Sequence, residues 1–98
     1  MIITNEPGFY KEGSYGIRIE NILHVRAAQD HANFLEFENM TMVPYCKELV
    51  DLALLKDEHR AEIQGYYEKI QDRVRPLLEK ERDTLALDYL SEQIDIKF

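Results

Sequence analysis

The sequence contains few of the residues that cross-link, bend or anchor a polypeptide. Its 98 residues include one cysteine, no tryptophan, three prolines and four glycines. The single cysteine, Cys46, excludes an intrachain disulfide. No apolar run approaches the roughly 20 residues that cross a bilayer, and the first residues have neither the basic nor the apolar region of a signal peptide. We therefore expect a cytoplasmic protein that spans no membrane.

Positive charge is also scarce. Nineteen acidic residues stand against twelve basic ones, which gives a formal charge of -7. Such a surface offers no basic stripe for phosphates and is repelled by nucleic acid and by anionic lipid. We expect neither nucleic acid nor a membrane as a partner. The hydrophobic fraction of 45% is ordinary for a globular protein, and the length fits one small domain or a piece of a larger one.

Two compositions meet near residue 50. The first half holds every glycine except Gly65 and favours short antiparallel strands. Tight turns are expected at Pro7-Gly8 and around Gly13-Ser14. The expected strands are Ile2 to Thr4, Gly16 to Glu20, Asn21 to Arg26 and Phe34 to Phe37.

The second half has helical periodicity. From Asp57 to about Lys80, apolar residues recur at three- and four-residue steps, which predicts one long amphipathic helix. Pro76 should kink this helix or end it about one turn early, and Thr84 is expected to cap a second helix. The apolar faces of the two helices are predicted from Ile63, Tyr67, Ile70, Val74 and Leu77, and from Leu85, Tyr89, Leu90 and Ile94. The fold class is therefore α+β.

Two glutamates in the first half are spaced symmetrically about a turn. Glu6 and Glu20 are 14 positions apart, and Gly13 is their midpoint. If the two arms pair antiparallel about this turn, the glutamates lie opposite each other on one face, with Cβ atoms roughly 4.5 to 5.5 Å apart. Two carboxylates held this close repel each other unless they share a proton or bind a cation.

A metal ion is the functional interpretation of this pair. Oxygen ligands favour hard or borderline ions such as Mn²⁺, and carboxylates can bridge two metals. Arg18 precedes Glu20 by two residues, so its guanidinium is on the same strand face and can orient a carboxylate. The spacing alone leaves a second interpretation open, because a glutamate before Pro-Gly, or at a strand end, usually faces water.

The residues around these glutamates resemble a known family. Ile3-Thr4-Asn5-Glu6-Pro7-Gly8-Phe9-Tyr10, followed by Gly16-Ile17-Arg18-Ile19-Glu20-Asn21, resembles the last two metal-ligand motifs of the pita-bread metallopeptidases. This paired motif is shared by Xaa-Pro aminopeptidases and prolidases. The stretch from Leu35 to Pro44, which leads through Leu49-Val50-Asp51 to a long helix, is similar to the eukaryotic-type aminopeptidase P.

The resemblance implies a dinuclear enzyme that removes an N-terminal residue preceding proline. Glu6 would ligate one of two divalent ions, most simply Mn²⁺, and would also move protons. Glu20 would bridge both ions. Arg18 would contact the ligands without binding metal itself. The reaction would be attack of metal-activated water on the Xaa-Pro carbonyl. Residues 1–50 would be the C-terminal part of the pita-bread catalytic domain, residues 51–98 a helical C-terminal extension, and homodimers would form through the C-terminal region.

The family's other ligands, two aspartates and a histidine, are upstream of the glutamates and are absent from this sequence. We therefore expect a fragment that needs the upstream remainder of the catalytic domain, binds metal weakly and is inactive alone. Two alternatives stay open: a fragment of a prolidase-type dipeptidase, and a non-catalytic oligomerisation module in which the glutamates are surface residues.

Overall fold

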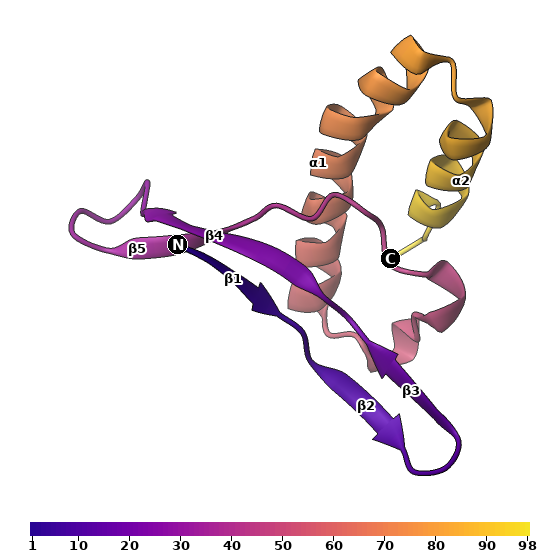
Figure 1. Cartoon of the computed structure of the whole chain (residues 1–98), viewed down its shortest axis with the longest axis horizontal. Coiled ribbons are helices and arrows are strands. Elements are labelled where there is room, and N and C mark those ends of the chain that lie inside the picture. The colour runs from indigo at the N-terminus through magenta and orange to yellow at the C-terminus, as the bar shows by residue number, and fades with distance from the viewer. The chain divides into compact units, whose positions relative to one another are not determined.

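The protein has two compact units, which we call the β unit and the helical unit. The computed structural model describes residues 1–98 and divides them into Met1–Thr41, the β unit, and Met42–Phe98, the helical unit (Figure 1). No helix of the chain combines the length and apolar character that crossing a membrane requires. The α+β class predicted from the sequence is confirmed.

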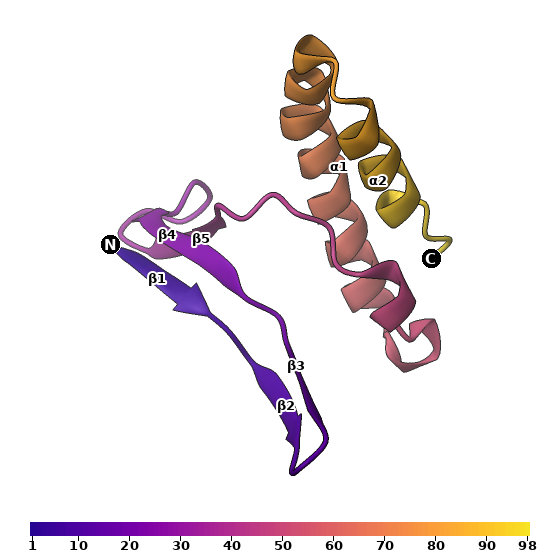
Figure 2. The ribbon, with the colours of Figure 1, turned by 45° about the vertical axis from the view of Figure 1, so that its right-hand side comes forward.

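The β unit consists of five antiparallel strands in two sheets. The three-stranded sheet has the order β1-β4-β5, and β2 and β3 form a two-stranded sheet (Figure 2). The strands are β1 (Ile2–Asn5), β2 (Gly8–Lys11), β3 (Tyr15–Arg18), β4 (Asn21–Ala27) and β5 (Leu35–Asn39).

The first four strands form one long hairpin with an interruption halfway along each arm. β1 continues into β2, and β3 continues into β4, in a single antiparallel arrangement. The chain reverses at Gly13, whose φ of 69° is in the left-handed region that glycine adopts without steric cost. The turn predicted there is confirmed. The turn predicted at Pro7-Gly8 is wrong, because Gly8 begins an extended strand and Pro7 lies at the interruption.

No side chain of the β unit is buried. Alternation along the strands gives the hairpin two different faces. The polar face carries Thr4, Glu6, Tyr10, Arg18 and Glu20. The opposite face carries apolar residues that are 37 to 59% exposed, among them Ile3, Phe9, Ile17 and Ile19.

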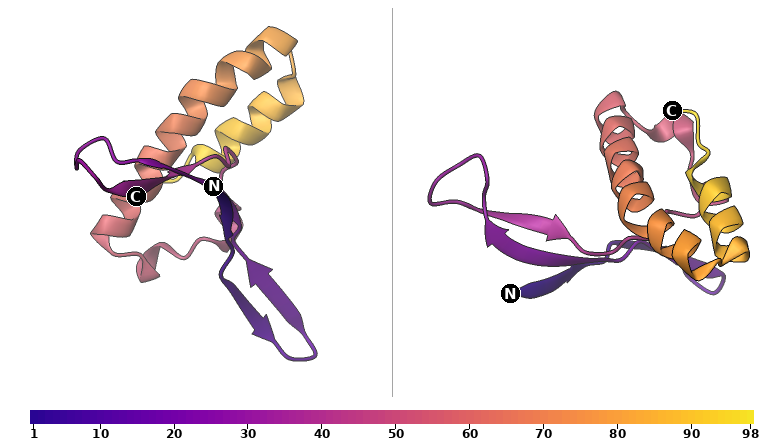
Figure 3. Two further views of the ribbon diagram at one scale, coloured as in Figure 1. Left: turned by 60° about the vertical axis from the view of Figure 1, so that its left-hand side comes forward. Right: turned by 90° about the horizontal axis from the view of Figure 1, so that it is seen from above.

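The helical unit is an antiparallel pair of helices preceded by two short 3-10 turns. The helices are α1 (Asp57–Glu81) and α2 (Thr84–Ile94), which lie side by side in both views of Figure 3, and the turns are η1 (Lys47–Leu49) and η2 (Leu52–Leu54). Tyr67, Ile70 and Leu90 form the buried core. The buried Gln93 accepts a hydrogen bond from the Lys47 N–H at 2.8 Å and so ties η1 to α2.

Three details of the helices differ from the sequence-based expectation. α1 does not end before Pro76 but continues to Glu81. The cap of α2 is Asp83, whose carboxylate accepts from the Ala86 N–H at 3.0 Å, and Thr84 is already the first helical residue. Among the predicted apolar positions, Leu77, Leu85 and Tyr89 are 62%, 83% and 52% exposed, whereas Leu78 packs against the core.

The boundary between the units falls between Thr41 and Met42, earlier than the change in composition near residue 50. The reason is packing in the segment before α1. Met42 and Tyr45 pack against the helical core, and the Tyr45 N–H donates to the Tyr67 hydroxyl at 3.2 Å. Residues 42–50 therefore belong structurally with the helices.

Candidate metal-ligand face of the β hairpin

Glu6 and Glu20 occupy the two interruptions of the hairpin. Asn5 pairs with Asn21 on one side of the interruption, and Gly8 pairs with Arg18 on the other. Two residues separate the pairs on each arm, so the register is unbroken and Glu6 is across from Glu20. This is the relation that the symmetric spacing about Gly13 predicts. Glu20 is outside the strand in which it was expected, since β3 ends at Arg18.

Fewer backbone hydrogen bonds join the two arms of the hairpin where the glutamates lie. Pro7 has no N–H to donate, and the hydrogen bond that remains is from the Ile19 N–H to the Pro7 carbonyl at 3.1 Å. The absence of the Pro7 N–H removes one ladder bond, and paired strands stand on either side of the two glutamates. The interruption therefore lies between two paired stretches of the hairpin, and both glutamates belong to it.

The Glu6 carboxylate is oriented by two neighbours. The Thr4 hydroxyl donates to Oε2 at 2.7 Å, and Nη1 of Arg18 is 3.6 Å from Oε1. Both neighbours come from the polar face, one from the same arm and one from the opposite arm. Arg18 is thus within ion-pair distance of one of the two candidate ligands.

Arg18 is itself held by an aromatic hydroxyl. Its Nε and Nη2 donate to the Tyr10 hydroxyl at 3.0 Å and 2.6 Å. This hydrogen bond to Tyr10, followed by the charges of Glu6 and Glu20, raises the pKa of Arg18. The guanidinium therefore remains a cation beside two carboxylates.

The donor set of this face suits a hard or borderline divalent ion, because both candidate ligands are carboxylates. It is incomplete as a cage. Nowhere in residues 1–98 do three or more His, Cys, Asp or Glu side chains gather as a metal site would require. Further ligands would have to come from outside these residues.

Tyr10 is the residue of this face that sequence reasoning did not single out. A signal was present in the spacing, since Tyr10 is two residues after Gly8 and pairs directly with Gly16. An aromatic residue across from glycine has room to lie flat on the sheet, but the hydrogen bond to Arg18 depends on a side-chain direction that the sequence does not specify.

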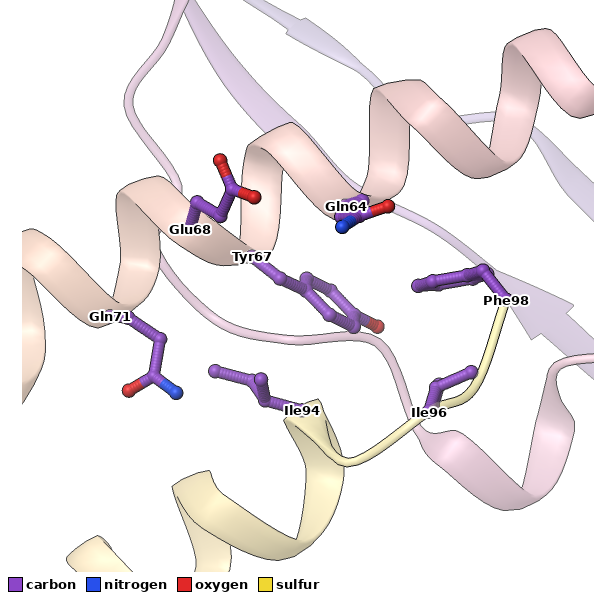
Figure 4. A pocket seen from close by; sticks show the side chains of 7 residues that line it. All are labelled: Gln64, Tyr67, Glu68, Gln71, Ile94, Ile96 and Phe98. Atoms are coloured by element: carbon purple, nitrogen blue, oxygen red, sulfur yellow. The ribbon is translucent and has the colours of Figure 1, made fainter.

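The helical unit has a separate shallow pocket that shows no such chemistry. Its volume is about 330 Å³. Glu68 is the one charged side chain in its lining, and the phenol ring of Tyr67 lies at its centre (Figure 4). The lining residues are Gln64, Tyr67, Glu68, Gln71, Ile94, Ile96 and Phe98. We assign this pocket to the packing between the helices and the C-terminal residues.

An interrupted hairpin with two glutamates opposite each other in register, followed by a helical pair, agrees with the C-terminal part of a pita-bread metallopeptidase, the class that the motifs around Glu6 and Glu20 resemble. Residues 33–95 match the family model described as the C-terminal region of peptidase M24. The chain belongs to this family.

The relatives indicate the aminopeptidase P branch. The chain is 38% identical over 97 residues to Xaa-Pro aminopeptidase 1 of Dictyostelium discoideum, covering 96% of this chain and 16% of that protein. It is 42% identical over 84 residues to aminopeptidase P2 of Arabidopsis thaliana, covering 81% and 12%. The chain thus spans less than a fifth of the length of these relatives.

A solved structure has the same fold. The X-prolyl aminopeptidase of Caenorhabditis elegans, described as a cytosolic enzyme with a di-nuclear active site, superposes with a TM-score of 0.85 at 34% identity, covering 98% of this chain and 16% of that one. The chain corresponds to a C-terminal part of an aminopeptidase P, as its motifs predicted.

Proposed function

We propose that this chain supplies two carboxylate ligands to a dinuclear Xaa-Pro aminopeptidase. The observation that carries the proposal is the unbroken register that sets Glu6 across from Glu20 at the interruption of the hairpin. Peptides with proline in the second position are the substrate class. The cytosol is the compartment, in keeping with the description of the nematode relative.

The roles of the residues follow from their contacts. Glu6, whose Oε2 accepts a hydrogen bond from Thr4 and whose Oε1 faces Arg18, would hold metal and would accept a proton from water. Glu20 would hold the metal ions together with Glu6, and Arg18 would orient Glu6. The two divalent ions, which we propose to be Mn²⁺, supply a lowered pKa for water and polarisation of the scissile carbonyl when bound.

The remaining ligands come from the upstream part of the catalytic domain, which this chain does not contain. The apolar face of the hairpin supports this proposal, because Phe9, Ile17 and Ile19 are 59%, 43% and 45% exposed and would be covered by that part of the domain. Two carboxylates bind metal weakly without their partners, so the 98-residue chain alone is inactive.

The test is hydrolysis of an Xaa-Pro-Xaa tripeptide with added Mn²⁺ by the full-length enzyme that carries this chain. Glu20→Gln should lower kcat by more than about 100-fold, because loss of a ligand exceeds the usual cost of losing an outer partner. Glu12→Gln, at the exposed turn of the same hairpin, is the matched control and should be neutral. A Glu20→Gln enzyme with normal activity and normal metal content would refute the assignment.

Two comparisons separate the alternatives. Cleavage of Xaa-Pro dipeptides in preference to tripeptides would favour a prolidase-type enzyme. Normal folding and assembly of the full-length protein without metal binding would favour the oligomerisation module.

Self-association through the helical unit is a second proposal, supported by exposed apolar side chains. Leu54, Leu77 and Leu85 are 79%, 62% and 83% exposed. If these residues line a homodimer interface, Leu85→Glu should shift the mass measured by light scattering from dimer to monomer, whereas Leu35→Glu on the β unit should not. An unchanged mass for Leu85→Glu would exclude this side chain from the interface.

A further inference from the structure

The two residues that follow Glu20 are hydrogen-bonded to side chains at the end of β5. Oδ1 of Asn21 accepts from Nδ2 of Asn39 at 3.3 Å, and the Ile22 N–H donates to the Thr41 hydroxyl oxygen at 2.9 Å. The Thr41 N–H in turn donates to Oδ1 of Asn39 at 3.0 Å. We call Asn21, Asn39 and Thr41 the clasp, because their side chains join the start of β4 to residues distant in sequence.

The clasp continues the pairing of β4 with β5 past the end of the backbone ladder. The last ladder pair joins Leu23 to Asn39. Beyond it, the Met40 N–H donates to the Ile22 carbonyl at 2.8 Å, and the hydroxyl of Thr41 accepts from the Ile22 N–H. Both backbone groups of Ile22 are therefore paired, one of them by a side chain. Removing that hydroxyl would leave an N–H without its acceptor.

The amides of the clasp lie on the face of the sheet opposite the candidate ligands. Side chains alternate along a strand, so consecutive residues such as Glu20 and Asn21 point to opposite faces. Asn21 and Leu23 share a face, and Asn39 is directly across from Leu23. The clasp therefore restrains the backbone next to Glu20 without taking space on the polar face.

The two candidate ligands differ in how this chain holds them. The Glu6 carboxylate has side-chain partners, the Thr4 hydroxyl at 2.7 Å and Nη1 of Arg18 at 3.6 Å. The Glu20 carboxylate makes no hydrogen bond within residues 1–98. Its position in this chain therefore depends on the backbone that carries it, and the clasp fixes that backbone on the side toward β4.

We propose that Asn39 and Thr41 are positioning residues for Glu20, which hold the backbone beside this ligand and so raise the affinity of the site for Mn²⁺. The proposal rests on the assignment of Glu20 as a metal ligand. Its physical basis is preorganisation, because a site binds metal more tightly when the ligands are already held in place by residues outside it.

The test measures Mn²⁺ affinity by chelator competition on the metal-free, full-length enzyme. Thr41→Val replaces the hydroxyl by a methyl group of similar size and should weaken Mn²⁺ binding by about 10-fold, the lower end of what outer partners of metal ligands contribute. Thr41→Ser keeps the oxygen and should stay within about twofold of wild type. Met40→Ala is the matched control in the same segment, because its backbone N–H still donates to Ile22, and should also match wild type.

A double-mutant cycle tests whether Thr41 acts through Glu20. In a Glu20→Gln background, Thr41→Val should change the remaining Mn²⁺ affinity by less than about twofold, because the ligand that it positions is gone. In a Glu6→Gln background the loss of about 10-fold should persist. Equal losses in the two backgrounds would overturn the proposal, since a general loosening of the hairpin affects both ligands.

A second variant tests the amide part of the clasp. Asn39→Ala removes the bonds to Asn21 and from the Thr41 N–H but keeps the Thr41 hydroxyl, and it should weaken Mn²⁺ binding by between about 2- and 10-fold. Circular dichroism of the metal-free enzyme checks that both variants fold. If both fail to fold, or if both fold and bind Mn²⁺ as wild type does, the clasp serves the fold alone and the positioning role is wrong.

The outcomes separate this inference from the proposed function. If Glu20→Gln removes Xaa-Pro hydrolysis and Thr41→Val behaves as Met40→Ala, the positioning role is wrong and the proposed function stands. If Thr41→Val weakens Mn²⁺ binding through Glu20 in an enzyme that does not hydrolyse Xaa-Pro peptides, the positioning role stands and the proposed substrate is wrong.

Discussion

The β unit and the helical unit differ in what holds their side chains in place. The helical unit buries Tyr67, Ile70 and Leu90, whereas no side chain of residues 1–41 is buried. All candidate ligands nevertheless lie in the β unit. There, backbone pairing and side-chain hydrogen bonds on an open face set their positions, and close packing does not. The candidate ligands and the buried core are thus in different units of this chain.

The same difference determines how each unit should respond to mutation. In a packed core the cost of a change depends on volume, because neighbours relax only partially. On an open hairpin face it depends on the particular hydrogen bond lost. Paired substitutions, one in each unit or one at each of two neighbouring positions, can measure this contrast.

The largest effect is expected from Ile70→Ala. Ile70 is fully buried, so its truncation should lower the free energy of unfolding by about 3 kcal/mol, within the range for large-to-small core changes. Ile17→Ala, at a residue 43% exposed in the β unit, should cost less than about 1 kcal/mol. Urea unfolding of the 98-residue chain, followed by circular dichroism, measures both. Equal losses of unfolding free energy in the two variants would contradict the difference in packing between the units.

Asp83→Ala should cost about 1 kcal/mol, the typical value for an N-cap. Its carboxylate accepts from the Ala86 N–H, and no other side chain takes this place. Thr84→Ala is the matched control at the adjacent position and should be nearly neutral in the same unfolding experiment. A larger cost for Thr84→Ala than for Asp83→Ala would support Thr84 as the cap of α2, as predicted from the sequence.

A stabilising change of about 0.5 to 1 kcal/mol is expected from Arg82→Gly, because an L-residue with a side chain is disfavoured in the left-handed region. Arg82 ends α1 with φ of 56°. Asn33 in the β unit has φ of 67°, but asparagine tolerates this conformation, so Asn33→Gly should gain less. The midpoint of thermal unfolding should rise for Arg82→Gly, and a fall would contradict the strain assigned to this residue.

The smallest effect is expected from titration of Tyr67, which changes the free energy of unfolding in alkali and not at neutral pH. Burial raises the pKa of its phenol, since the phenolate is poorly solvated in the core. A raised pKa in the folded state gives stability that is complete below about pH 10 and is lost as the pH rises through the folded value. Unfolding free energy should therefore fall in strong alkali, with a flatter dependence in Tyr67→Phe.

Tyr89→Phe is the control for this alkaline effect, because Tyr89 is 52% exposed on α2. It should keep the wild-type slope of stability against pH. If Tyr67→Phe also keeps that slope, titration of Tyr67 does not control unfolding in alkali.

Part of the candidate site was predictable because it depends on local rules. Gly13 permits the reversal, and a two-residue period then carries the same register back along both arms to Glu6 and Glu20. The interruption at the glutamates was not predicted, and Pro7-Gly8 was wrongly given a turn. Proline and glycine are typical of turns, but here Gly8 leaves space for the Tyr10 ring and Pro7 removes one backbone hydrogen bond between the two arms.

The sequence by itself determined the antiparallel hairpin, its register, the start of α1 and the metallopeptidase motif, because each depends on residues close in sequence or on a regular period. Only the tertiary structure decided that Leu78 and not Leu77 packs on the core, that residues 42–50 join the helices, and that Tyr10 holds Arg18. These outcomes depend on how a helix is rotated against its neighbour and on where a side chain points across two strands. Both are set by contacts between residues distant in sequence, which no local period specifies.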